Sequence, residues 1–373
     1  MSGYFLYHSI GTFPGKAASM TQALDEFAEA WSAEDDAQWP YALQQRQAFI
    51  EAWQRLIAAP AHSLTTAENV TTALFSLIGG LPSNVLRNKR VLVAADCFPS
   101  LHFLLAKLQD RFGFTLDTVP LREGSRWVND DDVLERWGPD VGLALLTLVS
   151  STSSHRCDVA RLAEHGRRMG SIVGVDITQG VGVVPFSVSA LPVDFVVSTS
   201  LKWLCGTSGA GILYVRPDLI QQCQPELRGW FSQENPFSWD LDKFNYAGDA
   251  RRFDHGTPAI LASVASLPGL QWVERTGVDA ITAQNRQSTE RLVAIAQENG
   301  WTLASPLNPQ ERGGSVMITL PDHAVPSDIV AGLRKRALYA DARGTTLRLS
   351  PGMVTTQDDV NALGEALQVM LRK

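Results

Sequence analysis

A lysine and an aspartate in the middle of the chain have the types and positions for covalent chemistry. Asp176 closes one apolar run, and Lys202 follows a second one. Leu201 and Trp203 flank the lysine, so water should solvate its amine poorly. Desolvation disfavours the ammonium form and lowers the pKa, which is what a lysine needs to form a Schiff base with a carbonyl group.

Two further features suit the cofactor pyridoxal phosphate. The stretch 65–69 opens a predicted helix, and a helix N-terminus offers free N–H groups to a phosphate. Phe98 follows a predicted strand and could stack on a flat ring. Asp176 could then keep the pyridine nitrogen of the cofactor protonated, which makes the ring an electron sink.

The elements that must position these residues have the pattern of an α/β protein. Short runs rich in Val, Ile and Leu alternate with helical periodicity, and they lie at residues 90–95, 141–148, 171–175, 194–198 and 210–215. Such runs are typical of strands buried on both faces, which predicts a mostly parallel sheet covered by helices. Ligands of such sheets bind beyond the carboxyl ends of the strands, where Asp176, Lys202 and Phe98 should meet.

We expect a large domain over residues 59–266 and a smaller α+β domain over residues 267–373. The second region has helical patterns at 281–299 and 358–371 and alternating strand patterns at 314–320 and 346–349. The helices predicted within residues 1–58 should pack with this smaller domain.

Composition excludes several classes of function. The chain has 373 residues, 45% hydrophobic and 19% charged, and its 32 basic and 39 acidic side chains give a net charge of −7. It has no basic run, so nucleic acid and anionic membranes are not expected partners. No apolar run approaches the roughly 20 residues of a membrane span, and the first residues do not resemble a secretory signal, so we expect a cytoplasmic protein. The four cysteines are irregularly spaced and predict reduced thiols, and the scattered histidines predict no metal site.

The chain resembles a known family in several short motifs. In order and spacing, they are similar to those of the fold-type I pyridoxal phosphate enzymes of aminotransferase class V, and most of all to kynureninase. The motifs are HSIGTFP at 8–14, FPSLH at 98–102, DITQ at 176–179, SLKWL at 200–204, FDHGTP at 253–258, DAR at 341–343 and LRLSP at 347–351. The resemblance implies a seven-stranded, mostly parallel sheet in the large domain.

It also implies roles for residues at the cofactor. Lys202 would form the internal aldimine and later move protons at the substrate α-carbon, Asp176 would pair with the pyridinium nitrogen, and Phe98 would stack on the ring. The remaining cofactor contacts implied are those of Glu68, Asn69, Gln179, and Thr199 or Ser200.

For the substrate and the assembly, the resemblance implies three further residues. Arg348 would bind the substrate α-carboxylate through its two-pronged guanidinium. Ser9 would contact the substrate. Thr257 would reach the phosphate in a neighbouring subunit, which implies a homodimer with shared active sites.

The reaction itself stays open at this stage. Kynureninase would hydrolyse the Cβ–Cγ bond of its substrate, whereas β-elimination, carbon–sulfur cleavage or amino-group transfer would use the same lysine. No cysteine follows Cys223, which argues against a persulfide-forming desulfurase. Departures from kynureninases include Ser150–Ser154 in place of tyrosines and Leu201 before the lysine. A scaffold that has lost its activity is the remaining alternative.

Several residues also have plain structural interpretations. Asp176 could cap a helix, Phe98 could be core, and Arg348 could be a surface ion-pair partner. Cys205 is expected to be a small buried thiol rather than a nucleophile.

Overall fold

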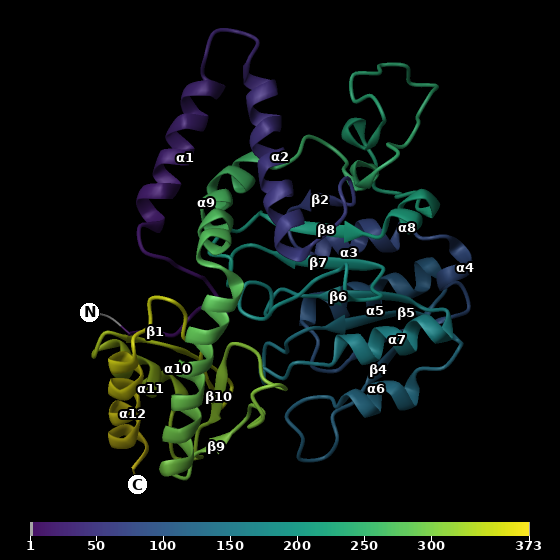
Figure 1. Cartoon of the computed structure of the whole chain (residues 1–373). Helices are drawn as coiled ribbons and strands as arrows, with labels where there is room; N and C mark the ends of the chain where they lie inside the picture. Colours follow the sequence, from purple (N-terminus) through teal and green to yellow (C-terminus); the bar gives the residue numbers. More distant parts are fainter. Residues whose placement is uncertain (1–2, 373) are drawn as a thin grey trace.

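A seven-stranded sheet forms the centre of the large domain in the computed structural model, which describes residues 3–372 (Figure 1). The strands follow the order β2-β8-β7-β6-β5-β3-β4. Their bounds are β2 Leu64–Ala67, β3 Arg90–Ala94, β4 Thr115–Val119, β5 Val141–Thr147, β6 Ile172–Asp176, β7 Phe195–Thr199 and β8 Gly211–Val215. The pairs from β4 through β7 are parallel, and β8 runs antiparallel to both of its neighbours. The predicted mostly parallel α/β sheet is confirmed.

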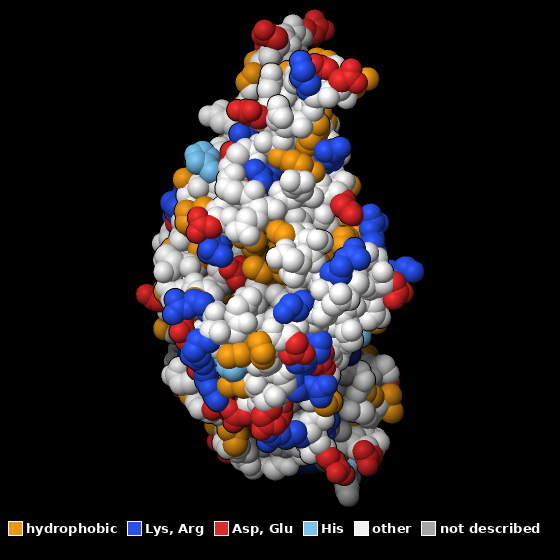
Figure 2. All heavy atoms as spheres, turned by 90° about the vertical axis from the view of Figure 1, so that its right-hand side faces the viewer, with side chains coloured by type: hydrophobic (Ala, Val, Ile, Leu, Met, Phe, Trp, Pro, Cys, Tyr) orange, Lys and Arg blue, Asp and Glu red, His pale blue; other side chains and the backbone are white. Residues whose placement is uncertain are grey.

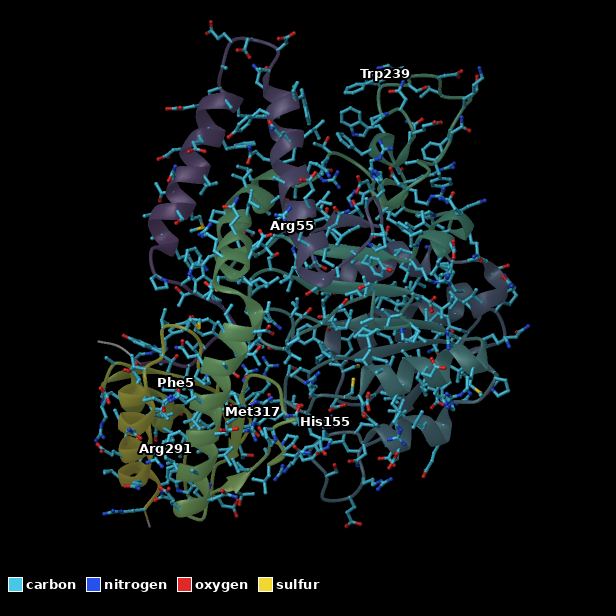
Figure 3. The ribbon with its side chains drawn as sticks, viewed as in Figure 1. Phe5, Arg55, His155, Trp239, Arg291 and Met317 are labelled. Atoms are coloured by element: carbon cyan, nitrogen blue, oxygen red, sulfur yellow. The ribbon has the colours of Figure 1, made fainter. Side chains whose placement is uncertain are left out.

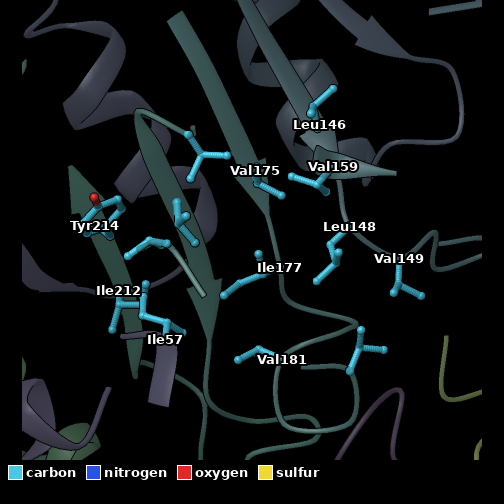
Figure 4. Packing of buried hydrophobic residues seen from close by; sticks show 14 of the residues in the cluster. Ile57, Leu146, Leu148, Val149, Val159, Val175, Ile177, Val181, Ile212 and Tyr214 are labelled. Carbon is cyan, nitrogen blue, oxygen red and sulfur yellow. The ribbon is translucent and has the colours of Figure 1, made fainter. Parts of the chain in front are cut away.

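The sheet is apolar on both faces because helices cover both. In β5, Leu143 and Leu145 belong to one hydrophobic cluster, while Ala144 and Leu146 belong to the other. Figure 4 shows part of the second cluster, in which Leu146 and other apolar side chains of neighbouring strands pack together. The covering helices are α3 Val70–Ile78, α4 Ser83–Leu86, α5 Pro99–Phe112, α6 Asp130–Arg136, α7 Val159–Met169 and α8 Pro217–Gln222.

The sequence pattern did not predict two strands of this sheet, β2 and β4. Both are edge strands with polar residues, LTTA and TLDTV, because each pairs on one side only. The stretch 65–69 therefore begins as a strand, and helix α3 starts only at Val70, with Asn69 as its N-cap. The expectation that a helix opens at residue 65 was wrong by about one turn.

The small domain has a four-stranded antiparallel sheet of order β12-β13-β10-β9. Its elements are β9 Thr302–Leu303, β10 Val316–Thr319, β12 Asp341–Arg343, β13 Thr346–Leu349, α10 Val278–Glu298, α11 Pro326–Arg334 and α12 Gln357–Leu371. It has its own hydrophobic cluster, which includes Phe5 from the N-terminal stretch (Figure 3). A smaller α+β unit was expected in this region.

Residues 3–58 contact different parts of the molecule. Strand β1 (Gly3–Tyr4) pairs with β11 (Leu338–Tyr339) of the small domain. Helices α1 (Lys16–Trp31) and α2 (Gln38–Ile57) instead pack on α9 (Ile260–Thr276) and extend away from the small domain (Figure 1). The expectation that these helices pack with the small domain is corrected, because the apolar face of α2 belongs to the core of the large domain through Phe49, Trp53 and Ile57.

Three features of the described residues concern binding to membranes, to charged partners and to metal ions. No helix in the described part of the chain is long and apolar enough to cross a membrane. On the face shown in Figure 2, basic and acidic side chains are interspersed rather than gathered by sign. Among residues 3–372, no group of three or more His, Cys, Asp or Glu side chains could hold a metal ion.

Candidate active site

A cavity of about 560 Å³ lies beyond the carboxyl ends of the parallel strands. Strands β2, β5, β6 and β7 all end there, so side chains distant in sequence meet at one edge of the sheet. The polar and charged residues that line it are Glu68, Asn69, Thr71, Thr72, Ser100, Thr147, Ser151, Asp176, Thr178, Gln179, Thr199, Lys202 and Ser208, and Phe98 is its aromatic residue.

Lys202 lies in the loop that follows β7, and its side chain is part of the cavity lining. Its Nζ atom is 5.4 Å from the centre of the Phe98 ring. Burial lowers the pKa of Lys202 to about 8, the charge of Asp176 opposes this shift, and the charges of Arg348 and Arg343 add to it. About one tenth of this amine is therefore unprotonated and nucleophilic at pH 7, and about half at pH 8.

This lowered pKa predicts how the cofactor-free protein should react with pyridoxal phosphate. Only the neutral amine attacks an aldehyde, so the loading rate should rise about tenfold per pH unit below pH 8 and level off above it. A lysine of ordinary pKa, 10.5, would show a rise that continues past pH 10. Stopped-flow absorbance from pH 6 to 10 measures this, and a rate that still rises steeply between pH 9 and pH 10 would contradict the environment described for Lys202.

Asp176 ends β6 and is 5% exposed. Its Oδ1 atom accepts a hydrogen bond from the Thr178 N–H at 2.9 Å. Burial raises the pKa of Asp176, and hydrogen bonding from Thr178 and the charge of Lys202 oppose this only in part. A cation against this carboxylate, such as a protonated pyridine nitrogen, would offset the cost of burying its charge.

The start of helix α3 forms another wall of the cavity. Asn69 caps the helix, and its side-chain oxygen accepts from the N–H groups of Thr71 and Thr72 at 3.0 Å each. Gly209 also lines the cavity, and its φ of +86° favours glycine. A phosphate placed here would meet hydroxyl groups and the positive end of the helix dipole.

Glu68 brings a negative charge to the same wall. Its Oε1 atom lies 3.4 Å from Nε2 of His255, and this interaction is the main reason that the pKa of Glu68 falls to about 2. The carboxylate in turn raises the pKa of His255. A protonated His255 therefore offsets a charge that would otherwise repel a phosphate.

Most of the predicted cofactor residues line the cavity, but Ser200 and Thr257 do not. Gln179 donates from Nε2 to the His8 carbonyl at 3.0 Å. The Ser200 hydroxyl accepts from Trp53 Nε1 at 3.1 Å and so links the lysine loop to helix α2. Thr257 is exposed, in a segment whose neighbouring residues border Glu68 and Gly209.

The predicted substrate residues lie outside the lining. Ser9 is in a turn, and its N–H donates to the Leu6 carbonyl at 2.8 Å. Arg348 on β13 is 6% exposed and binds Asp341 on β12 with two nitrogens, Nε at 2.8 Å from Oδ1 and Nη2 against Oδ2. Its charge nevertheless lowers the pKa of Lys202, so the tertiary structure brings this arginine within electrostatic range of the lysine.

Sequence reasoning missed several hydroxyl groups in the cavity. Thr147, at the end of β5, pairs in register with Asp176, and its Oγ1 is buried without a hydrogen-bond partner among residues 3–372. Ser151, Thr178 and Ser208 also line the cavity. The signal that could have identified Ser151 and Thr178 is their place shortly after a predicted strand, whereas Thr147 lies within one and Ser208 precedes one. An unpartnered hydroxyl beside a buried carboxylate, an amine and an aromatic ring fits a polar, planar ligand such as pyridoxal phosphate.

Gly11 packs closely against the loop that carries Lys202. The Gly11 N–H donates to the Leu201 carbonyl at 3.0 Å, and a Cβ atom at this position would lie 1.9 Å from the Lys202 carbonyl oxygen. Gly11→Ala should therefore displace the lysine loop and weaken pyridoxal phosphate binding by about tenfold or more. Gly248→Ala, where a Cβ meets nothing within 4 Å, is the matched control. Equal cofactor affinity in both variants would show that this close approach is unimportant.

Comparisons with known proteins agree with this geometry. The family model described as aminotransferase class V matches residues 41–363. Among curated relatives, an uncharacterized aminotransferase YcbU of Bacillus subtilis is 25% identical, and isopenicillin N epimerase of Streptomyces clavuligerus is 26% identical, each over 86% of this chain and 83% of its own length. Kynureninase of Bacillus anthracis is 27% identical over 65% of this chain and 57% of the relative.

Solved structures show the same fold. A cystine C–S lyase, C-DES, in complex with cysteine persulfide superposes with a TM-score of 0.88 at 21% identity, covering 100% of this chain and 98% of that one. A cysteine desulfurase from Thermococcus onnurineus gives 0.87 at 20% identity, covering 99% and 94%. A C-DES variant of similar score, 0.87 at 20% identity over 99% and 97%, has glycine covalently linked to its pyridoxal phosphate.

Proposed function

This chain belongs to the aminotransferase class-V family and is a pyridoxal phosphate enzyme, and from that premise we propose that it cleaves a side-chain bond of an L-α-amino acid. The bond would break by Cβ–Cγ hydrolysis, as in kynureninase, or by β-elimination. The observation that carries the proposal is the buried amine of Lys202, with a pKa near 8, in one cavity with Asp176 and Phe98.

Each of these residues has a chemical task in the proposal. When bound, pyridoxal phosphate delocalises the electron pair left on the substrate when a bond at the α-carbon breaks. Lys202 would hold the cofactor through its aldehyde, and Nζ, once free, would take the proton from the substrate α-carbon. Asp176 would keep the ring nitrogen protonated, and Phe98 would pack against the ring.

The substrate is oriented by its carboxylate. Arg348 uses Nε and Nη2 for Asp341, which leaves Nη1 without a hydrogen-bond partner among residues 3–372. Arg343 adds a second positive charge within range of Lys202. We propose that an α-carboxylate binds Arg348, because this places the α-carbon near the lysine.

The cysteines support a reaction that needs no protein thiol. Cys97, Cys205 and Cys223 are buried, and burial raises the pKa of each thiol to about 12. Cys157 is half-buried, and desolvation together with nearby carboxylates raises its pKa well above the ordinary value. None of the four lines the cavity. The described residues therefore offer no thiolate to attack a substrate sulfur, as a persulfide-forming desulfurase requires.

Amino-group transfer is the second candidate. It requires Lys202 to move a proton from the substrate α-carbon to the cofactor, and the same geometry serves that step. The similarity to an uncharacterized aminotransferase over most of the chain favours keeping this candidate.

We also propose a homodimer that shares its active sites. Thr257 is exposed on a segment that borders the cavity wall at Glu68 and Gly209. Beyond it, the loop with Phe237, Trp239 and Leu241 presents large apolar side chains to solvent, Trp239 being 81% exposed (Figure 3). Apolar groups gathered in this way are typical of a protein interface. In a dimer Thr257 would contact the phosphate of the partner subunit.

The proposed reaction is tested with the purified, cofactor-loaded protein. L-Kynurenine, L-alanine and S-aryl cysteine conjugates are added separately, and visible spectra and products are followed. Release of alanine with an aromatic acid would establish hydrolysis, and release of pyruvate with a thiol would establish elimination. Conversion of the cofactor to its pyridoxamine form without side-chain cleavage would overturn the proposal in favour of the aminotransferase.

A further inference from the structure

Outside the cavity lining, the side chains of His8, Asp341, Arg348, Ser350 and Ser315 form one connected polar cluster. Four of them are almost fully buried, with His8 2% exposed and Ser350 0% exposed, and Asp341 is half-buried. They come from the N-terminal stretch, from β12 and β13, and from the segment before β10. Buried polar groups are costly unless they bind one another, so such a cluster has a defined arrangement.

The distances define the order of contacts. His8 Nε2 lies 3.0 Å from Asp341 Oδ1, and His8 Nδ1 lies 2.7 Å from the Ser350 hydroxyl. Ser350 in turn lies 2.6 Å from the Ser315 hydroxyl. A bare nitrogen lone pair would repel the carboxylate, so the proton belongs on Nε2, and Nδ1 then accepts from Ser350.

The charges agree with this assignment. Burial lowers the pKa of His8, so its imidazole is neutral at physiological pH. Contacts with His8 and Arg348 outweigh burial and hold the pKa of Asp341 well below its usual range. Asp341 is thus a carboxylate that the guanidinium of Arg348 binds and that lies in close contact with the neutral imidazole of His8.

His8 also binds the large domain. Its carbonyl accepts from Gln179, which lines the cavity, and three residues later Gly11 contacts the loop of Lys202. One short stretch of chain therefore connects the cavity wall to the small-domain arginine.

We propose that His8 is a positioning residue for the substrate carboxylate: it fixes Asp341, which in turn orients the guanidinium of Arg348. The proposal rests on the proposed binding of an α-carboxylate by Arg348. His8 itself touches neither substrate nor cofactor in it.

The test uses L-alanine and L-alaninamide, which differ in the carboxylate alone, as probes of the cofactor-loaded protein. Their dissociation constants are obtained from the change in visible absorbance. Wild-type protein should bind L-alanine more tightly, and Arg348→Lys should lower this preference. His8→Ala should lower it by on the order of tenfold, because Asp341 loses its contact with the imidazole and no longer holds the guanidinium in one orientation.

Conservative variants separate positioning from folding. In His8→Gln the amide nitrogen reaches as far as Nε2 and should retain the preference, whereas the shorter His8→Asn should lose it. Ser315→Ala removes a hydroxyl from the far end of the same buried cluster and should leave the preference unchanged. Melting temperature and cofactor loading are recorded for each variant.

The outcomes distinguish the two proposals. If Arg348→Lys loses the preference while His8→Ala and His8→Asn keep it, the role of His8 is overturned and carboxylate binding by Arg348 stands. If wild-type protein shows no preference for L-alanine, carboxylate binding by Arg348 is wrong, and the role of His8 falls with it.

Discussion

Replacement of Lys202 by alanine should abolish covalent attachment of the cofactor and reduce turnover by about 10³-fold or more. The variant loses both the amine that holds the aldehyde and the group that removes the α-proton, and general base catalysis by itself contributes about 10² to 10⁴-fold. Mass spectrometry after borohydride reduction measures attachment, and product formation measures turnover. Methylamine in the buffer should restore part of the activity, because it supplies the missing amine.

The control is Lys107→Ala, which removes an exposed lysine from helix α5. It should retain attachment and turnover. If Lys202→Ala kept its turnover, the catalytic role of Lys202 would be wrong. If the cofactor-loaded wild-type protein showed no turnover with any amino acid, the chain would be a scaffold with the fold of an enzyme.

Replacement of Asp176 by asparagine should lower turnover by about 10²-fold or more while the fold is kept. Asparagine has nearly the same shape, but it cannot stabilise a protonated pyridine nitrogen beside it, so the ring becomes a poorer electron sink. The loss should appear in kcat, and the absorbance of the bound cofactor should change its dependence on pH. Stopped-flow absorbance with L-alanine measures the α-proton step directly.

Asp117→Asn is a matched control for this variant. Asp117 is a similarly buried carboxylate, but it lies on β4 and pairs with Arg90 and Arg136. Its replacement should cost about 1 to 3 kcal/mol of stability and leave the cofactor spectrum unchanged. If Asp176→Asn lowers only the melting temperature, as this control should, then Asp176 is a structural residue and not a partner of the ring.

The core of the fold could be predicted because its signals are local. Strands β3, β5, β6, β7 and β8 are apolar on both faces, and each predicted run lies within a few residues of the observed strand. The predictions failed at β2 and β4, because these edge strands pair on one side only and carry polar residues that weaken the pattern.

The site also has residues that a local sequence signal marks and contacts that no such signal marks. Asp176, Phe98 and Lys202 could be assigned because each follows a strand end, and strand ends of a parallel sheet meet at one edge. The bond of Ser200 to Trp53 and the pair of Glu68 with His255 join distant segments, and the sequence has no pattern that marks them.

The sequence by itself therefore determined the α/β class, the mostly parallel sheet and the lysine and aspartate at its edge, since apolar periodicity and strand ends are properties of neighbouring residues. Only the tertiary structure decided that α1 and α2 pack on α9 and that His8 meets Asp341 and Arg348. Such contacts depend on how separately formed elements pack, and side chains more than 300 positions apart become neighbours only because the small domain packs against the N-terminal stretch.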